Sequence, residues 1–246
     1  MNQIKEYWPG KHVLITGGTS GLGRALAVQL HNLGAHVVVV ARHRPIEWDT
    51  LEGDSISLIT GDVSDKNAIH RIHAEALTLL SARNSSLNQD TVPQIDVLFN
   101  NASALGPTPL RLLLDTDCED FAQVLETNLI GPFRIIKLVL PAMILSQSGV
   151  VVNISSDAAV SAYPRWGAYG SSKAALDHLT RILQEEIADT GVRCLALDPG
   201  DMDTPLHFAA VPDADRAKLN SPESSATLML KQIASAEVAP VRRSIR

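Results

Sequence analysis

Short, strongly apolar segments alternate along the chain with longer segments whose apolar residues recur at helical spacing. The apolar segments carry too few polar residues to be half exposed, as the four valines of 37–40 illustrate, so they predict buried strands. The predicted strands are 12–16, 37–40, 56–60, 95–99, 150–154 and 192–197. The predicted helices are 21–33, 65–80, 117–146, 168–190 and 222–233.

Strand and helix alternate throughout the chain. This order predicts an α/β fold, a Rossmann-type doubly wound parallel sheet with helices on both faces, because right-handed crossovers place helices on its two sides. Pro132 and Pro141 are expected to bend or interrupt the helix at 117–146. No internal repeat or linker occurs, so residues 1–246 are expected to form a single domain. A ligand is expected at the carboxyl ends of the strands, at the topological switch point.

Three segments break the alternating pattern. The polar residues 82–94 predict a surface loop, and the proline-rich residues 199–221 predict an irregular segment that encloses the substrate. The tail at 235–246 is expected to be irregular. It carries a basic cluster that is expected to be solvated: Arg242, Arg243 and Arg246.

Composition and charge limit the possible functions. Apolar residues make up 45% of the chain and the formal net charge is -6, so a core can form without disulfides, and no nucleic-acid partner is expected. Cys118 and Cys194 lie in neither a redox nor a metal-ligand spacing, and the histidines have no ligand spacing either. We therefore expect no metal and a reducing, cytoplasmic location. No signal peptide and no run of 18 apolar residues is present, so no membrane partner is expected.

A glycine-rich turn follows the first predicted strand and opens the first helix. In residues 16–23, Thr-Gly-Gly-Thr-Ser-Gly-Leu-Gly, the glycines let the backbone approach a pyrophosphate, and the helix start offers unpaired N–H groups and a positive dipole end. The alternative is a tight turn that binds nothing. Under the first interpretation the turn's cofactor-binding residues are Gly17, Thr19, Ser20, Gly21, Leu22 and Gly23.

The end of the second strand bears on which nicotinamide nucleotide binds. An acidic residue there would bind the adenosine ribose diol and repel a 2′-phosphate. Here the strand ends in Ala41, followed by Arg42, whose guanidinium can bind a phosphate through two N–H groups. The sequence therefore predicts NADP(H) in preference to NAD(H), with Arg42 as a cofactor-binding residue. The alternative is that Arg42 and Arg44 are ordinary loop charges.

Tyr169 and Lys173 lie four residues apart in a predicted helix, and therefore on one helix face. An ammonium stabilises a nearby tyrosinate, so Lys173 is expected to lower the pKa of Tyr169 from its ordinary value of about 10. The same spacing is common on solvated helix surfaces, so it does not define a site by itself.

Together these motifs resemble those of the short-chain dehydrogenase/reductase superfamily. The resemblance covers about residues 10–205 and rests on the Thr-Gly-x-x-x-Gly-x-Gly turn, on Tyr-x-x-x-Lys and on further segments in the family's order. These segments are Asp62-Val63, Asn100-Asn101-Ala102, Asn128, Asn153-Ile154-Ser155-Ser156, and Pro199-Gly200 with Thr204. The resemblance implies a nicotinamide-dependent oxidoreductase that interconverts a small-molecule carbonyl and alcohol.

The resemblance also implies a role for each site residue. Tyr169 would be the general acid in reduction and the base in oxidation, and Lys173 would lower its pKa and bind the nicotinamide ribose. Ser156, thirteen positions before Tyr169, would hold the substrate oxygen. Asn128 would fix a water that links Lys173 to solvent. The other implied cofactor contacts are Asp62, Val63, Asn101, Ala102, Pro199, Gly200, Met202 and Thr204, the last two at the carboxamide.

The chain departs from the family pattern at several positions. Ser103 replaces the glycine after Asn-Asn-Ala, and the usual C-terminal strand is missing from the sequence, which leaves its tetramer contact open. Asp201 and Asp203 are either solvated loop acids or recognise a basic or hydroxyl-rich substrate.

Some alternatives in function and assembly also remain open. The first is a dehydratase or epimerase on the same scaffold, and the second is a non-catalytic protein that senses NADP(H). The resemblance also implies a homodimer or homotetramer, because the helices near 117–146 and 166–189 often pair between subunits in the family.

Overall fold

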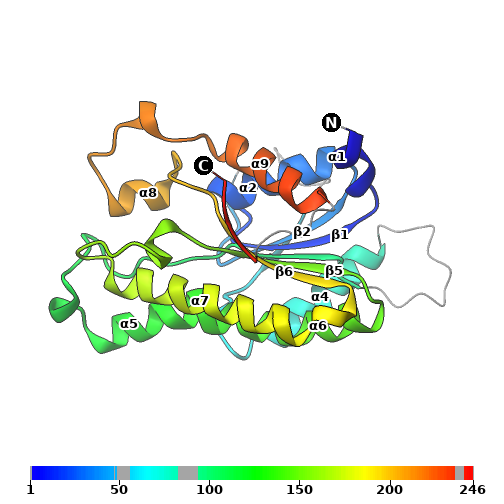
Figure 1. Cartoon of the computed structure of the whole chain (residues 1–246), viewed down its shortest axis with the longest axis horizontal. Helices are drawn as coiled ribbons and strands as arrows, with labels where there is room; N and C mark the ends of the chain where they lie inside the picture. Colours follow the sequence, from blue (N-terminus) through cyan, green and yellow to red (C-terminus); the bar gives the residue numbers. More distant parts are fainter. Residues whose placement is uncertain (1, 47, 49–55, 83–93, 236–240, 246) are drawn as a thin grey trace.

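Seven parallel strands form one sheet, in the order β3-β2-β1-β4-β5-β6-β7 (Figure 1). The computed structural model describes residues 2–46, 48, 56–82, 94–235 and 241–245. The strands are β1 (His12–Thr16), β2 (His36–Ala41), β3 (Ser57–Thr60), β4 (Val97–Asn100), β5 (Gly149–Ile154), β6 (Val192–Asp198) and β7 (Arg242–Ser244). The order reverses between β1 and β4, so the predicted Rossmann sheet and its switch point are confirmed.

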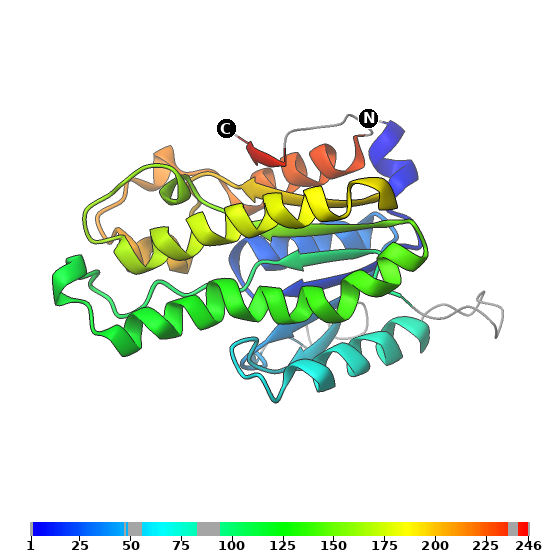
Figure 2. The same ribbon diagram turned by 60° about the horizontal axis from the view of Figure 1, so that its bottom comes forward.

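Helices cover both faces of the sheet, as Figures 1 and 2 show. One layer holds α1 (Asn2–Tyr7), α2 (Gly21–Asn32) and α9 (Pro222–Ala234). The other holds α4 (Ile69–Ala82), α5 (Cys118–Leu125), α6 (Gly131–Leu145) and α7 (Gly167–Glu186). The short α8 (Pro205–Ala210) lies beyond the carboxyl ends of the strands.

The strands are apolar throughout because the two helix layers bury both faces of the sheet. Along β1, Val13 and Ile15 pack into the core under α2 and α9, whereas Leu14 packs into the core under α4 and α6. The valines of β2 alternate in the same way between the two cores. This double burial fixes the register, since a shift by one residue would exchange the two faces.

A π-helical turn, Glu126–Ile130, joins α5 to α6, so helix continues from Cys118 to Leu145. The predicted interruption lies here, because Pro132 in the first turn of α6 has no N–H for the carbonyl four residues before it. By length and composition alone this 28-residue run could cross a membrane. In the structure its buried face, which includes Ile135 and Val139, packs on the sheet as a core helix does.

The C-terminal prediction was wrong in two respects. Residues 242–244 are not irregular: they form β7, which extends the sheet beside β6. Arg242 is not a solvated tail residue either, because it forms an ion pair with the buried Asp177. The remaining tail residues 236–240 and 246, and residues 83–93 of the predicted surface loop, lie outside the described residues. Helix α1 has no counterpart among the predicted elements.

The segment at 199–221 is more ordered than predicted. It contains α8 and a β-bridge between Met202 and Asn220. The guanidinium of Arg216 lies 4.5 Å from the ring centroid of Phe208 and 3.5 Å from a carboxylate oxygen of Asp203. Residues 199–221 therefore fold back on themselves over the end of the sheet, held by contacts between their own aromatic and charged side chains.

Candidate active site

A cavity of about 1000 Å³ opens at the carboxyl ends of the strands, where the sheet order reverses. Loops after six neighbouring strands, β1 to β6, line it, as parallel strands that end at one edge require. The structure brings nearly all of the predicted site residues to its wall. The exceptions are Gly23, which lies behind the glycine turn, and Asn128, which is fully buried.

The glycine turn has the geometry that a pyrophosphate site needs. Gly17 has a φ of +67°, and a Cβ there would lie 2.9 Å from the Cα of Ala102. A Cβ on Gly23 would overlap the carbonyl oxygen of Gly17, so this glycine lets α2 start directly against the turn. Ser20 at the N-cap of α2 gives no side-chain cap, which leaves the helix N–H groups to a ligand.

Asn101 braces this turn from the neighbouring strand. Its Nδ2 donates to the carbonyl oxygens of Thr16 at 2.9 Å and Gly17 at 3.0 Å. The hydroxyl of Thr16 accepts the backbone N–H groups of Asn101 and Ala102, each at 3.0 Å. Asn101 therefore shapes the cofactor wall through its side chain, an action that the sequence alone did not specify.

The end of the cavity beside β2 is basic on one side. Ala41 and Arg42 line it together with His43 and Arg44. The carboxylate of Asp62, across from them after β3, accepts from the backbone and hydroxyl of Ser64 at 2.8 Å each, and it lines the cavity too. No carboxylate occupies the end of β2, so nothing on that strand would repel a 2′-phosphate.

Tyr169, Ser156 and Lys173 meet at the other end of the cavity. The hydroxyls of Ser156 and Ser103 lie near the hydroxyl of Tyr169, where both lower its pKa. Lys173 is buried beside it, with Nζ 5.5 Å from the centroid of the Tyr169 ring and donating to the carbonyl of Ile154 at 2.7 Å. Ser156 acts on the pKa of Tyr169, whereas the hydroxyl of Ser155 turns toward a backbone carbonyl.

The pKa of Tyr169 differs from the sequence-based expectation. Burial raises it from 10.0 to about 12, although hydrogen bonds from Ser156 and Ser103 oppose the rise. Burial also lowers the pKa of Lys173 from 10.5 to about 8, against the charge of Asp177. Lys173 is not among the groups that shift the pKa of Tyr169, and desolvation outweighs the hydrogen bonds that lower it, so the expected net lowering of this pKa is not found.

Asn128 lies in the π-helical turn, and both polar atoms of its side chain form hydrogen bonds. Its Nδ2 donates to the carbonyl of Ala104 and to the hydroxyl of Ser172, and its Oδ1 accepts from the backbone of Ala104 and the hydroxyl of Ser103. A water held by Asn128 would have to bind its backbone carbonyl, which Pro132 deprives of its ordinary helical donor. The side chain instead ties α7 to the loop that carries Ser103.

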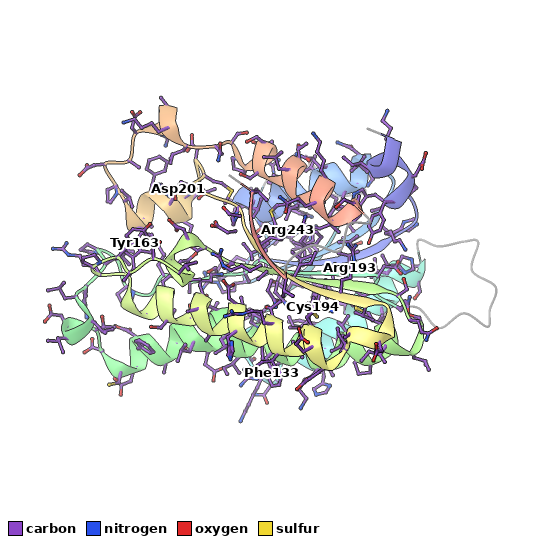
Figure 3. All side chains as sticks on the ribbon, in the orientation of Figure 1. Phe133, Tyr163, Arg193, Cys194, Asp201 and Arg243 are labelled. Atoms are coloured by element: carbon purple, nitrogen blue, oxygen red, sulfur yellow. The ribbon has the colours of Figure 1, made fainter. Side chains whose placement is uncertain are left out.

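The substrate end of the cavity has one aromatic wall. Trp166 packs edge-on to both Tyr163 and Tyr169, with ring centroids 6.4 and 5.6 Å apart. Tyr163 donates to Asp157 at 2.9 Å, and the other oxygen of Asp157 accepts from Ser156 at 3.1 Å. This link was not predicted from the sequence, since nothing local marks Asp157. Figure 3 shows Tyr163 and Asp201 at this end of the molecule.

The loop after β6 closes the same end from the opposite side. Pro199, Gly200, Met202 and Thr204 all line the cavity, and the Thr204 hydroxyl caps α8 by accepting from the backbone of His207. Asp201 is 64% exposed and also lines the cavity. Asp203 pairs with Arg216 and is absent from the wall, so of the two loop acids only Asp201 lines the cavity.

A Rossmann sheet, an uncapped helix at a glycine turn and a tyrosine–lysine pair in one cavity define a nicotinamide-dependent oxidoreductase. Residues 11–214 match the family model of short chain dehydrogenases, and the chain belongs to that family. It is therefore an NAD(P)-dependent enzyme of the kind that acts on CH–OH and C=O groups.

Several curated and solved proteins are similar to this chain. A 2-(R)-hydroxypropyl-CoM dehydrogenase of Xanthobacter autotrophicus is 32% identical over 78% of this chain and 75% of its own. A 3beta-hydroxysteroid dehydrogenase of Mediterraneibacter gnavus is 31% identical over 80% and 67%. A short-chain dehydrogenase structure from Streptomyces avermitilis has a TM-score of 0.80 and 27% identity over 96% and 87%. The structure of ElxO with NADP bound has a TM-score of 0.79 and 26% identity over 96% and 97%.

Proposed function

We propose that this chain is an NADP(H)-dependent oxidoreductase that interconverts a small-molecule carbonyl and alcohol, with Tyr169 as general acid and base. The observation that carries the proposal is that Tyr169, Ser156 and Lys173 line the same cavity as the glycine turn, with Nζ of Lys173 5.5 Å from the centroid of the Tyr169 ring. When bound, the nicotinamide supplies or accepts the hydride.

The chain's own residues hold the reactants and move the proton. Ser156 donates a hydrogen bond to the substrate oxygen, where negative charge develops during reduction. Tyr169 gives its hydroxyl proton to that oxygen, and the raised pKa keeps the proton on Tyr169 until the charge appears. The Lys173 ammonium then stabilises the tyrosinate, and Asn128 keeps α7 in place through Ser172.

The same proposal assigns the cofactor's parts to the wall of the cavity. The pyrophosphate lies on the turn of residues 17–23, the adenine edge near Asp62 and Val63, and the nicotinamide beside Asn101, Ala102 and the loop of 199–204. The observation that favours NADP(H) is Ala41 at the end of β2, with Arg42 next on the wall. The NADP-bound structure at 26% identity supports the same choice.

Replacement of Arg42 tests the nucleotide preference. Loss of a charge-assisted contact costs about 1.5–3 kcal/mol, so Arg42→Ala should weaken NADPH binding roughly tenfold to hundredfold. NADH binding should change by less than about threefold, since it has no 2′-phosphate. Lys231→Ala on the exposed face of α9 is the charge-matched control. Equal weakening of both nucleotides by Arg42→Ala would contradict the assignment.

The catalytic part is tested by turnover of a ketone and aldehyde panel with NADPH and NADH. Tyr169→Phe should reduce kcat at least about 100-fold and keep nucleotide binding, because it removes only the proton donor. Tyr7→Phe, outside the cavity, is the matched control. Nucleotide binding without any carbonyl reduction by the wild-type protein would instead favour a sensor, and absence of binding would reject the nucleotide site.

We further propose a cytoplasmic location and a homodimer or homotetramer. The location is supported by two free cysteines, the exposed Cys118 and the buried Cys194, which suit a reducing compartment. Assembly is supported by apolar side chains that remain exposed on helices α6 and α7, Phe133 and Ile182 among them. Light scattering of the purified protein measures the mass, and a monomer would reject the assembly.

A further inference from the structure

The C-terminal strand brings a charged side chain to the catalytic region. β7 pairs with the last residues of β6, with Arg242 beside Ala196 and Ser244 beside Asp198. On the other edge of β6, the backbone N–H of Ser155 donates to the carbonyl of Leu197. β7 therefore lies only one strand away from the point where the chain leaves β5 for the catalytic serine. Figure 3 labels Arg243, the next residue of this strand.

The Arg242 guanidinium joins three separate elements. Its Nε donates to Oδ2 of Asp177 on α7 at 2.6 Å, and a terminal nitrogen donates to the backbone carbonyl of Ser156 at 3.0 Å. The same nitrogen lies 4.0 Å from Oδ2 of Asp198 at the end of β6. The side chain of Arg242 is 27% exposed, whereas those of both aspartates are 4% exposed. A planar guanidinium holds several acceptors at fixed angles, which a lysine ammonium does not.

Each acidic partner of Arg242 adjoins a different part of the proposed machinery. Asp177 follows Lys173 by one helical turn, and its charge acts on that ammonium. The other carboxylate oxygen of Asp177 is buried without a hydrogen bond in the described part of the chain, so Arg242 is the group that neutralises it directly. Asp198 accepts the backbone N–H of Gly200 at 3.0 Å and so anchors the loop after β6.

We propose that Arg242 is a positioning residue of the catalytic centre. It fixes the backbone of Ser156, and with it the hydroxyl beside Tyr169, and it compensates the Asp177 charge behind Lys173. The inference rests on the proposed roles of Ser156, Tyr169 and Lys173. Arg242 lies beyond residues 11–214 that match the family, so family membership does not assign it this role.

Two substitutions separate the two actions. Arg242→Gln removes both the positive charge and the planar guanidinium. Arg242→Lys keeps the charge but loses the hydrogen bond to the backbone carbonyl of Ser156. The charge of Asp177 on α7 acts on Lys173, and the charges of Asp198 on β6 and Asp157 after β5 act on the neighbouring Tyr169. Arg242 on β7 pairs with Asp177 and lies 4.0 Å from Asp198. Loss of the positive charge makes this surrounding more negative, so the Lys173 pKa should rise in Arg242→Gln and stay near its wild-type value in Arg242→Lys.

Activity should fall in both variants, because a displaced hydroxyl near the reacting oxygen reduces the rate by up to about 100-fold. We expect kcat to fall at least about tenfold, with the NADPH dissociation constant changed by less than about threefold. Arg243→Gln is the matched control, since it removes the same charge from the next position of β7 and its side chain makes no ion pair in the described part of the chain.

The experiment combines steady-state kinetics on a carbonyl that the wild type reduces with NMR titration of isotope-labelled lysine Cε, which reports the Lys173 pKa without any substrate. A raised Lys173 pKa in Arg242→Gln but not in Arg243→Gln, with reduced kcat in both Arg242 variants, supports the role. The positioning role is overturned if Arg242→Gln leaves both the Lys173 pKa and kcat unchanged. It is also overturned if Arg243→Gln changes them as much as Arg242→Gln does. If the wild type reduces no carbonyl, the proposed function fails and the titration alone decides the role of Arg242. If Arg242→Gln does not fold, kcat of Arg242→Lys tests whether Arg242 positions Ser156. A wild-type kcat in Arg242→Lys would then overturn the proposed role of Arg242.

Discussion

Replacement of Gly23 by alanine tests whether the glycine turn has to keep its present shape for nucleotide binding. An added Cβ would overlap the carbonyl oxygen of Gly17 and lie 2.5 Å from Nδ2 of Asn101, closer than Cβ contacts in proteins. The methyl group must therefore push the turn away from α2 or break the brace that Asn101 provides. Overpacking of this kind costs about 1–3 kcal/mol.

That cost should appear in the binding equilibrium, because the free turn can relax whereas the nucleotide requires its present shape. A loss of about 1–3 kcal/mol corresponds to roughly a fivefold to 150-fold weaker affinity, measured by fluorescence titration with NADPH. Gly149→Ala is the matched control: its Cβ would lie 2.5 Å from the Cγ of Met143 in the core, away from the cavity. It should lower thermal stability and leave the affinity unchanged. A Gly23→Ala protein with wild-type affinity would refute the reasoning.

Three further predictions follow from the charges and hydroxyls of the site. Ala41→Asp should shift the preference toward NADH by at least about tenfold, because a carboxylate there repels the 2′-phosphate, and the ratio of the two dissociation constants checks this. Because burial lowers the Lys173 pKa from 10.5 to about 8, the unfolded chain holds more protons between these values. The free energy of unfolding should therefore rise from about pH 8 to about pH 10, and urea titrations of Lys173→Met should show a smaller rise. Ser103→Gly removes a hydrogen bond that lowers the pKa of Tyr169, so the alkaline limb of the pH–rate profile should move to higher pH.

Much of the fold was predictable because its signals are local. Strands buried on both faces give uninterrupted apolar runs such as β2, and six of the seven strands were predicted on that basis. β7 was missed because its sequence, Arg-Arg-Ser, is polar and only three residues long. It forms a strand because the edge of β6 offers it backbone hydrogen bonds, as in the bond from Ala196 to the carbonyl of Val241.

The sequence by itself determined the parts of the site that lie close together along the chain. Tyr169 and Lys173 are four positions apart, and helical periodicity alone puts them on one face. The glycine turn is likewise contained within eight residues, and its position after an apolar run and before a helical pattern indicates its role.

Only the tertiary structure decided which distant groups surround these residues. The high pKa of Tyr169 depends on burial by several elements, and the hydroxyl of Ser103 comes to it from a loop 66 positions earlier in the chain. Arg242 and Asp177 are 65 positions apart in the sequence, and they form their ion pair because Arg242 lies in a strand that the hydrophobic pattern did not predict. Desolvation and charge compensation depend on distances in space, and the pairing of sheet edges sets those distances, whereas residue spacing along the chain does not.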